Sequence, residues 1–92
     1  MLKLNTSSRF RKDLKLCAKR GCDLTLLQEV IDTLRMPAPL PPANREHKLS
    51  GNHAGECECH IAPDWLLIYR FHENELVLSL THTGTHADLF DL

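Results

Sequence analysis

The sequence predicts a small α+β protein in which two N-terminal helices pack on a mainly antiparallel sheet, in the order β-α-α-β-β-β. Its 92 residues suffice for one domain, residues 1–92, and not for two. Hydrophobic residues make up 42% of the chain and charged residues 25%, which is the composition of a globular protein. The apolar residues recur with a helical period before the proline-rich centre and alternate after it, and this change sets the order of the elements.

The N-terminal segment predicts one strand and two helices. MLKLN alternates leucine with polar residues, as a strand does. A first helix follows the capping hydroxyls of Thr6, Ser7 and Ser8 and ends at Gly21, and Asp23 caps a second helix. The apolar stripes consist of Phe10, Leu14 and Cys17 in the first helix and Leu24, Leu27, Val30, Ile31 and Leu34 in the second. Because only a few residues join the helices, we expect them to be antiparallel neighbours or nearly so.

The remainder predicts a long loop and then strands. MPAPLPPANREHKLSGNHAG has four prolines and no period, and a loop of this length is either functional or an inactive proline-rich crossover. In ECECHI the strand alternation puts Cys57, Cys59 and Ile61 on one face and Glu56, Glu58 and His60 on the other. WLLIYRF is a nearly continuous apolar strand, HENE has the composition of a hairpin turn, and LVLSLTH is another strand.

Charge is distributed unevenly along the chain. Residues 1–35 hold eight Lys/Arg against four Asp/Glu, and residues 36–92 hold three against eight. The basic part is either a surface for an acidic partner such as nucleic acid or the solvated faces of two helices. No apolar run has the length of a membrane span, and the N-terminus lacks a signal-peptide pattern, so we expect a cytoplasmic protein without membrane contact. In that compartment the four cysteines are reduced thiols or metal ligands.

Histidine is the most informative residue type, with six in 92 residues. Five of them flank the long loop, the polar strand face and the C-terminal turn: His47, His53, His60, His82 and His86. Imidazole is the side chain best suited to proton transfer near neutral pH. We expect these histidines to converge, although any one of them alone is better explained as a surface or structural residue.

Three segments carry a resemblance to a known family: HKLSG, ECHIAPDWLLIY and the terminal GTHADLF. Together they resemble RelE/ParE-superfamily toxins of the YafQ type, the ribosome-dependent mRNA interferases of type II toxin–antitoxin systems. The resemblance extends over nearly the whole chain. It implies a RelE-like fold and an endoribonuclease that cleaves mRNA in the ribosomal A site, by attack of a 2′-hydroxyl on the neighbouring phosphate, with no metal or other cofactor.

The motifs also imply catalytic residues, namely His47, His60, Asp64 and His86. A ribose hydroxyl needs a base to remove its proton, and the departing 5′-oxygen needs an acid to supply one. We expect His60 and His86 to form this pair. Asp64 is a second base or orients an imidazole, although it is also an ordinary turn residue. His47 transfers a proton or steadies the phosphate.

The same motifs imply that Trp65 and Phe90 bind substrate, because aromatic rings stack on unpaired bases. Two simpler interpretations stay open. Trp65 opens an apolar strand and can belong to the core, and Phe90 can seal the end of the sheet.

The segment GNHAGECECH departs from the family pattern, because Cys57 stands where an arginine is usual and His53 stands near an aromatic position. The isoelectric point near 6.6 is also low for a ribosome ligand, whose affinity depends on neutralising phosphates. We therefore expect other side chains to contribute to substrate binding: His53, Lys12, Lys15, Lys19 and Arg20.

The resemblance implies three partners: a cognate antitoxin protein, the ribosome and mRNA. DNA is contacted only indirectly, through the antitoxin complex. One alternative is a ParE-like toxin that acts on DNA gyrase without nuclease activity, but that branch lacks the histidine set. Another is a zinc module built from Cys57, Cys59 and His60 with His53 or His86, against which the strand alternation argues.

Overall fold

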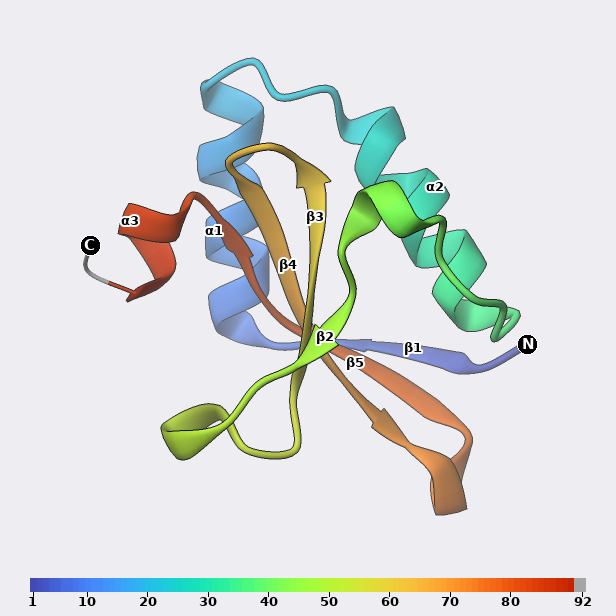
Figure 1. Cartoon of the computed structure of the whole chain (residues 1–92). Coiled ribbons are helices and arrows are strands. Elements are labelled where there is room, and N and C mark those ends of the chain that lie inside the picture. The colour runs from blue at the N-terminus through green and yellow to red at the C-terminus, as the bar shows by residue number, and fades with distance from the viewer. Residues whose placement is uncertain (91–92) are drawn as a thin grey trace.

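A five-stranded sheet in the order β1-β5-β4-β3-β2 forms one layer of the computed structural model, which describes residues 1–90 apart from the side chain of Glu73. The elements are β1 (Lys3–Thr6), α1 (Ser8–Lys19), α2 (Leu24–Arg35), β2 (His47–Lys48), β3 (Cys57–Ala62), β4 (Trp65–His72), β5 (Val77–Gly84) and α3 (His86–Phe90). β1 pairs parallel to β5, and the other neighbours are antiparallel. The predicted α+β class is confirmed, including two N-terminal helices on a mainly antiparallel sheet (Figure 1).

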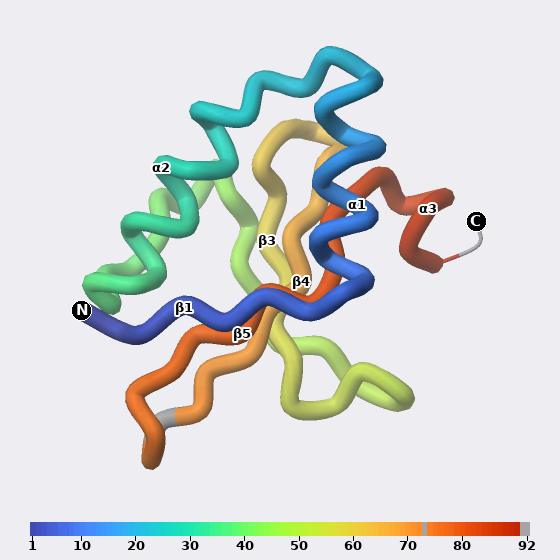
Figure 2. The backbone as a smooth tube through the Cα atoms, turned by 180° about the vertical axis from the view of Figure 1, so that it is seen from behind, coloured from blue at the N-terminus to red at the C-terminus, as the bar shows by residue number. Residues whose placement is uncertain are grey.

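Side-chain caps start both long helices where the sequence predicts them. Ser7 Oγ accepts the Phe10 N–H at 2.9 Å, and Asp23 Oδ1 accepts the Thr25 N–H at 3.0 Å. The expectation that the helices are antiparallel neighbours is wrong, because they diverge from their connecting turn in both Figure 1 and Figure 2. The short turn brings only one end of each helix together. Beyond it, α1 packs on β5 and α2 lies against β3.

The core lies between the two helices and one face of the sheet. Its buried members are Phe10, Cys17, Leu27, Val30, Ile31, Leu34, Cys59, Trp65, Leu67, Tyr69, Leu78 and Leu80. β4 is also buried on its other face, where Leu66 and Ile68 have no exposed surface. This double burial explains why β4 has a nearly continuous apolar sequence.

Two short elements were not predicted. β2 lies inside the segment that we expected to be a loop, and α3 follows β5 at the C-terminal end. Elements of two and five residues are too short to produce a recognisable hydrophobic period. The predicted HENE turn is a short 3₁₀ segment, Glu73–Glu75.

Two irregularities in the sheet lie next to histidines. Between β3 and β4 the register shifts after His60, so that Ile61 is unpaired. Between β4 and β5 the register shifts beside Ile68, so that Thr81 is unpaired next to His82. Such bulges bend a strand and redirect its side chains, and they are frequent beside active sites.

Within residues 1–90, no helix has the length and the apolar character that crossing a membrane requires.

Candidate active site

Glu58 lies at the centre of a group of imidazoles on the sheet face opposite the two long helices. Its Oε1 is 3.4 Å from His47 Nε2 and 3.9 Å from His60 Nε2, and its side chain is only 6% exposed. His47 is directly opposite Glu58 in the β2–β3 pairing, and His60 follows two residues later on the same face of β3. A carboxylate so little exposed requires polar neighbours, and these two imidazole nitrogens lie within 3.9 Å of it.

His86, the first residue of α3, is tied to Asp64 in the turn between β3 and β4. Its Nδ1–H and its backbone N–H both donate to Asp64 Oδ1, at 2.7 Å and 3.0 Å. These two hydrogen bonds hold the pKa of the Asp64 carboxyl below its ordinary value. The ring centroid of His86 lies 5.7 Å from that of His60. Because Asp64 engages Nδ1, the Nε2 of His86 is left to exchange a proton.

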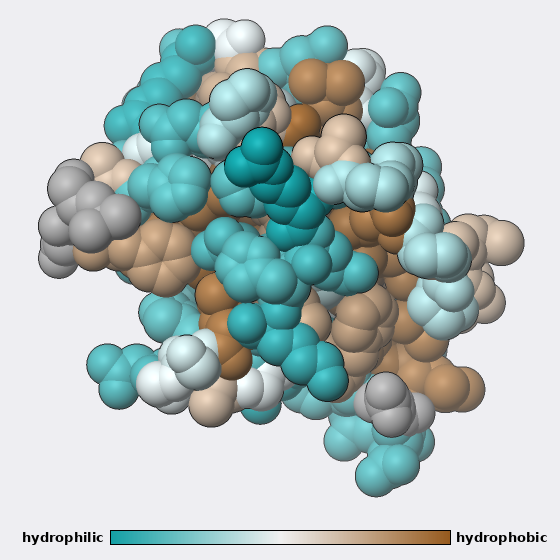
Figure 3. Space-filling model, viewed as in Figure 1, coloured by the Kyte–Doolittle hydropathy of each residue, from teal (hydrophilic) through white to brown (hydrophobic). Residues whose placement is uncertain are grey.

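The structure therefore brings together the four residues that we expected to be catalytic, from β2, β3, the β3–β4 turn and α3. In the view of Figure 1, β2 lies in front of the other strands, and Figure 3 shows hydrophilic residues gathered over it from the same side.

A hollow of about 410 Å³ adjoins His60. Its lining residues are Ala43, Asn44, Arg45, His60, Ile61, Ala62 and Pro63. Asn44 fixes the loop to the strand, since its side-chain amide donates to the His60 carbonyl at 2.7 Å. The loop is also held at Glu46, whose carboxylate accepts the Tyr69 hydroxyl. These contacts fix the loop that carries Arg45, which lines the same hollow as His60.

His53 and Phe90 form a second group, centred on Glu56. Their ring centroids are 5.6 Å apart, and His53 Nδ1 lies 3.1 Å from Glu56 Oε1. Thr81 donates to the other oxygen of Glu56 at 2.6 Å. Burial raises the pKa of Glu56, but these hydrogen bonds outweigh it and hold the pKa below its ordinary value. Burial lowers the pKa of His82, whose ring lies 6.0 Å from that of His53.

The remaining residues expected to bind substrate lie elsewhere. Trp65 is 7% exposed, belongs to the core, and donates from its indole to Thr83 Oγ1 at 3.0 Å, which favours the core interpretation. The helix-one lysines, Lys12, Lys15 and Lys19, are exposed on α1, which covers the sheet face opposite the imidazoles. Arg20 forms an ion pair with Asp88 at 2.6 Å.

The donor atoms of Glu58, His60 and His86 all lie within 4.8 Å of one another, which makes them the one candidate metal-ligand group that residues 1–90 contain. The zinc set considered from the sequence is not assembled in that part of the chain. Cys59 has no exposed surface and faces the core, where burial raises the pKa of its thiol to about 12. Thiolate is the form of cysteine that binds metals, so Cys59 is unsuited to this role.

Two residues of the site were missed by the sequence reasoning, Glu58 and Arg45. The strand alternation assigned Glu58 to the polar face of β3, which predicts an exposed side chain. In the structure Glu58 is buried, and β2 pairs with β3 at this position. Arg45 could have been found from the sequence because it lies only two residues before the expected catalytic His47. In the structure the Nδ1–H of His47 donates to the Arg45 carbonyl at 3.1 Å.

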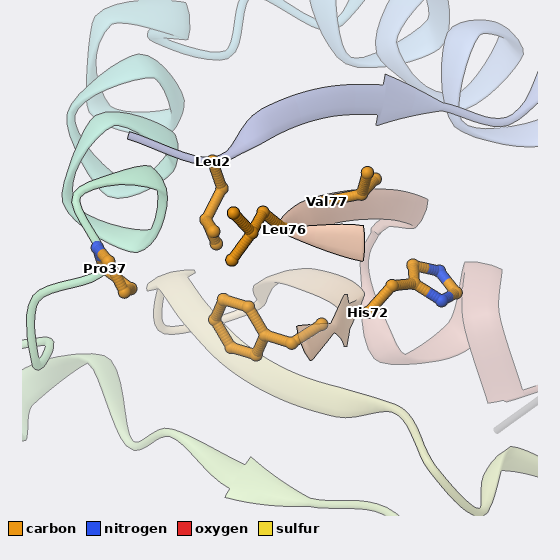
Figure 4. Close-up of a pocket in the computed structure, with 6 residues that line it drawn as sticks. Leu2, Pro37, His72, Leu76 and Val77 are labelled. Carbon is orange, nitrogen blue, oxygen red and sulfur yellow. The ribbon is translucent and has the colours of Figure 1, made fainter. Parts of the chain in front are cut away.

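A second hollow, of about 280 Å³, is lined by Leu2, Pro37, Phe71, His72, Leu76 and Val77. Its lining is largely apolar and combines residues of β4 and β5 with Leu2, which precedes β1, and Pro37, which follows α2 (Figure 4). None of the expected catalytic residues lines it.

Comparisons with known proteins identify the family to which the chain belongs. A sequence model of the family described as "Bacterial toxin of type II toxin-antitoxin system, YafQ" matches residues 2–91. The mRNA interferase toxin YafQ of Escherichia coli K12 is 38% identical over 85 residues, which cover 91% of this chain and 90% of that protein. A metal-bound toxin from Helicobacter pylori has a TM-score of 0.93 and 42% identity, covering 98% of this chain and 100% of that one.

A structure of the E. coli DinJ-YafQ complex matches with a TM-score of 0.88 and 35% identity, covering 98% of this chain and 99% of that chain. The sequence match, the shared fold and the histidine motifs agree, and the chain belongs to the YafQ family of bacterial toxins of type II toxin–antitoxin systems.

Proposed function

We propose that this toxin is a ribosome-dependent mRNA interferase and that the imidazoles around Glu58 perform the cleavage. The observation that carries the proposal is the convergence of His47, His60, His86 and Asp64 from four separate segments beside a hollow. The E. coli relative at 38% identity is an mRNA interferase toxin, which supports the same activity here.

The chemistry needs two proton transfers and no redox step. A base takes the proton of the 2′-hydroxyl while its oxygen bonds to phosphorus, and an acid protonates the 5′-oxygen as its bond to phosphorus breaks. Each transfer is typically worth about 10²- to 10⁴-fold in rate. His60 and His86 are the proposed pair, since their rings lie 5.7 Å apart and Asp64 orients His86.

Charge builds on the phosphate in the transition state and requires nearby cations. His47 and Arg45 are the proposed groups, because His47 lies 3.4 Å from Glu58 and Arg45 lines the hollow beside His60. Arg45 supplies the positive charge that is absent at Cys57. Glu58 is proposed to hold His47 and His60 in place through its Oε1, which lies near both rings.

Substrate binding extends beyond the reacting phosphate. The paired rings of His53 and Phe90 offer an aromatic surface for an unpaired base. Lys12, Lys15 and Lys19, on the helix layer, are proposed to contact ribosomal RNA rather than the cleaved bond.

The proposed function also names partners and a place of action. The E. coli relative forms a complex with DinJ, so we expect a cognate antitoxin protein for this chain and contact with DNA only through that complex. Translated mRNA and ribosomes place the activity in the cytoplasm.

Primer extension on a translated message tests the proposal. The purified toxin should cut the message on ribosomes, and His86→Gln should not. His72→Gln is a matched control, because His72 lines the distant apolar hollow. Intact messages together with accumulating DNA damage in induced cells would instead indicate a toxin that acts on gyrase.

A second candidate property is the binding of a transition metal by Glu58, His60 and His86. Imidazole nitrogen and carboxylate oxygen are suitable zinc ligands, their donor atoms lie within 4.8 Å, and the H. pylori relative is a metal-bound toxin. A metal there would occupy the nitrogens needed for proton transfer, so binding and cleavage should compete. Calorimetric titration with zinc, repeated on Glu58→Gln, tests for the site, and cleavage with added zinc or a chelator tests for competition.

A further inference from the structure

We infer that Arg20 and Asp88 are positioning residues for His86, because their ion pair fixes helix α3 to the end of α1 and thereby holds the His86 imidazole beside His60. The inference rests on the proposed function. It assigns to Arg20 a role different from the ribosome contact expected from the sequence.

The ion pair joins two segments that are far apart in the chain. Arg20 is the C-cap residue of α1, and Asp88 is the third residue of α3. The guanidinium engages both carboxylate oxygens, with Nη1 at 2.6 Å from Oδ2 and Nη2 at 3.4 Å from Oδ1. A two-point contact between planar groups restricts orientation as well as distance.

Asp88 also organises the first turn of α3. Its Oδ2 accepts the Thr85 N–H at 3.1 Å, and its own N–H donates to Thr85 Oγ1 at 3.1 Å, which is a reciprocal cap. Gly84 leaves room for this carboxylate, since a Cβ there would lie 3.0 Å from Oδ2. The glycine, threonine and aspartate of GTHAD thus form one unit around His86.

A helix of five residues does not hold its own shape in water, so the place of α3 depends on contacts outside it. Three of its side chains make such contacts: His86 binds Asp64 and lies beside His60, Phe90 packs against His53, and Asp88 binds Arg20. The helix also lies against β5. The two hydrogen bonds of Asp64 reach only the first residue of α3, so the place of the rest of the helix depends on its other contacts. The ion pair restrains α3 from the α1 side.

A positioning role for Arg20 and a contact of Arg20 with ribosomal RNA predict different activities in a double variant. If Arg20 acts through Asp88, removing both side chains costs no more activity than removing Asp88 alone. If Arg20 binds phosphate independently, the two losses multiply. A positioning role also changes kcat and leaves KM for the ribosome-bound message nearly unchanged.

The experiment is a double-mutant cycle on ribosome-dependent cleavage with Arg20→Gln, Asp88→Ala and the double variant. Wild type and His86→Gln are measured first, so that failure of the nuclease proposal is recognised separately. Arg20→Gln should lower kcat about tenfold, because a small displacement of a catalytic group has effects of this order. Arg20→Lys should recover part of the rate. Arg9→Gln, which removes an exposed α1 arginine paired with Asp13, is the matched control.

Two further readouts separate positioning from unfolding. The melting temperature should fall by no more than about 5 °C, since exposed ion pairs contribute little to stability. The His86 ring resonances should shift in NMR spectra of Arg20→Gln but not of Arg9→Gln. Unchanged kcat in Arg20→Gln, or losses that multiply in the double variant, would overturn the inference.

Discussion

The imidazole of His86 and the carboxylate of Asp64, 22 residues apart in sequence, meet through a hydrogen bond of 2.7 Å. The same carboxylate oxygen accepts the backbone N–H of His86, so both the ring and the start of α3 are fixed by one side chain. A carboxylate that holds one ring nitrogen sets the tautomer of the imidazole and leaves the other nitrogen for proton transfer.

Asp64→Asn should therefore lower kcat for mRNA cleavage by about tenfold to 100-fold, because the amide no longer stabilises the imidazolium that proton transfer creates. Thermal stability should change little, since the Asp64 side chain is 65% exposed. Single-turnover cleavage of a ribosome-bound message measures the effect. Full activity of Asp64→Asn would remove this carboxylate from the mechanism.

Glu58→Gln should lower cleavage and also weaken the binding of added zinc. The carboxylate lies 3.4 Å from His47 and 3.9 Å from His60, and the neutral amide holds protonated imidazoles less well. The control is Glu29→Gln, an exposed glutamate of α2 in the helix layer, on the opposite side of the sheet from the imidazoles. If Glu58→Gln and the control variant cleave equally well, Glu58 does not contribute to cleavage.

Charge reversal of the three helix-one lysines, Lys12, Lys15 and Lys19, should weaken ribosome binding without changing the rate of bond cleavage at saturation. These side chains are exposed on the layer opposite the imidazoles, so we expect them to affect affinity only. Because neutralising phosphates releases counterions, the affinity should also become less dependent on salt. Binding measured at several salt concentrations, with Lys3→Glu on β1 as control, checks this. Identical affinity of the triple variant would contradict the assignment.

Acid should weaken the attachment of α3. Hydrogen bonding to Arg20 lowers the pKa of Asp88 to about 2 from its ordinary value of 3.8. A depressed carboxyl pKa adds stability that is present above about pH 4 and is lost as the pH falls toward 2. Acid unfolding of wild type and Asp88→Asn should therefore converge over this range. In NMR titrations, Arg20→Gln should move the Asp88 midpoint upward, and an unchanged midpoint would show that Arg20 is not the cause.

The fold could be predicted to the extent that local chemistry determines it. The caps at Ser7 and Asp23 set the helix starts, and the alternation around Cys59 set the two faces of β3. The divergence of the helices and the parallel pairing of β1 with β5 could not be predicted, because they depend on how the sheet twists and on contacts distant in sequence.

For the site, the sequence motifs predicted which residues come together, but they did not identify the side chains that hold these residues in position. Glu58 has the pattern of an exposed strand residue, and its burial arises only when His47 pairs across from it. Arg20 has the pattern of a solvated helix cation, and only the position of α3 reveals Asp88 as its partner. For Trp65 the local pattern was the better guide than the motif. Its apolar strand indicated a core position, and the structure places Trp65 in the core.

The most direct test of the account compares single-turnover cleavage rates of His60→Gln, His86→Gln and the double variant on ribosome-bound mRNA. If the two imidazoles act as one acid–base pair, each single change lowers the rate at least about 100-fold and the double variant is little worse than either. Wild-type rates in both single variants, with both proteins folded, would contradict the claim that this group of histidines cleaves RNA.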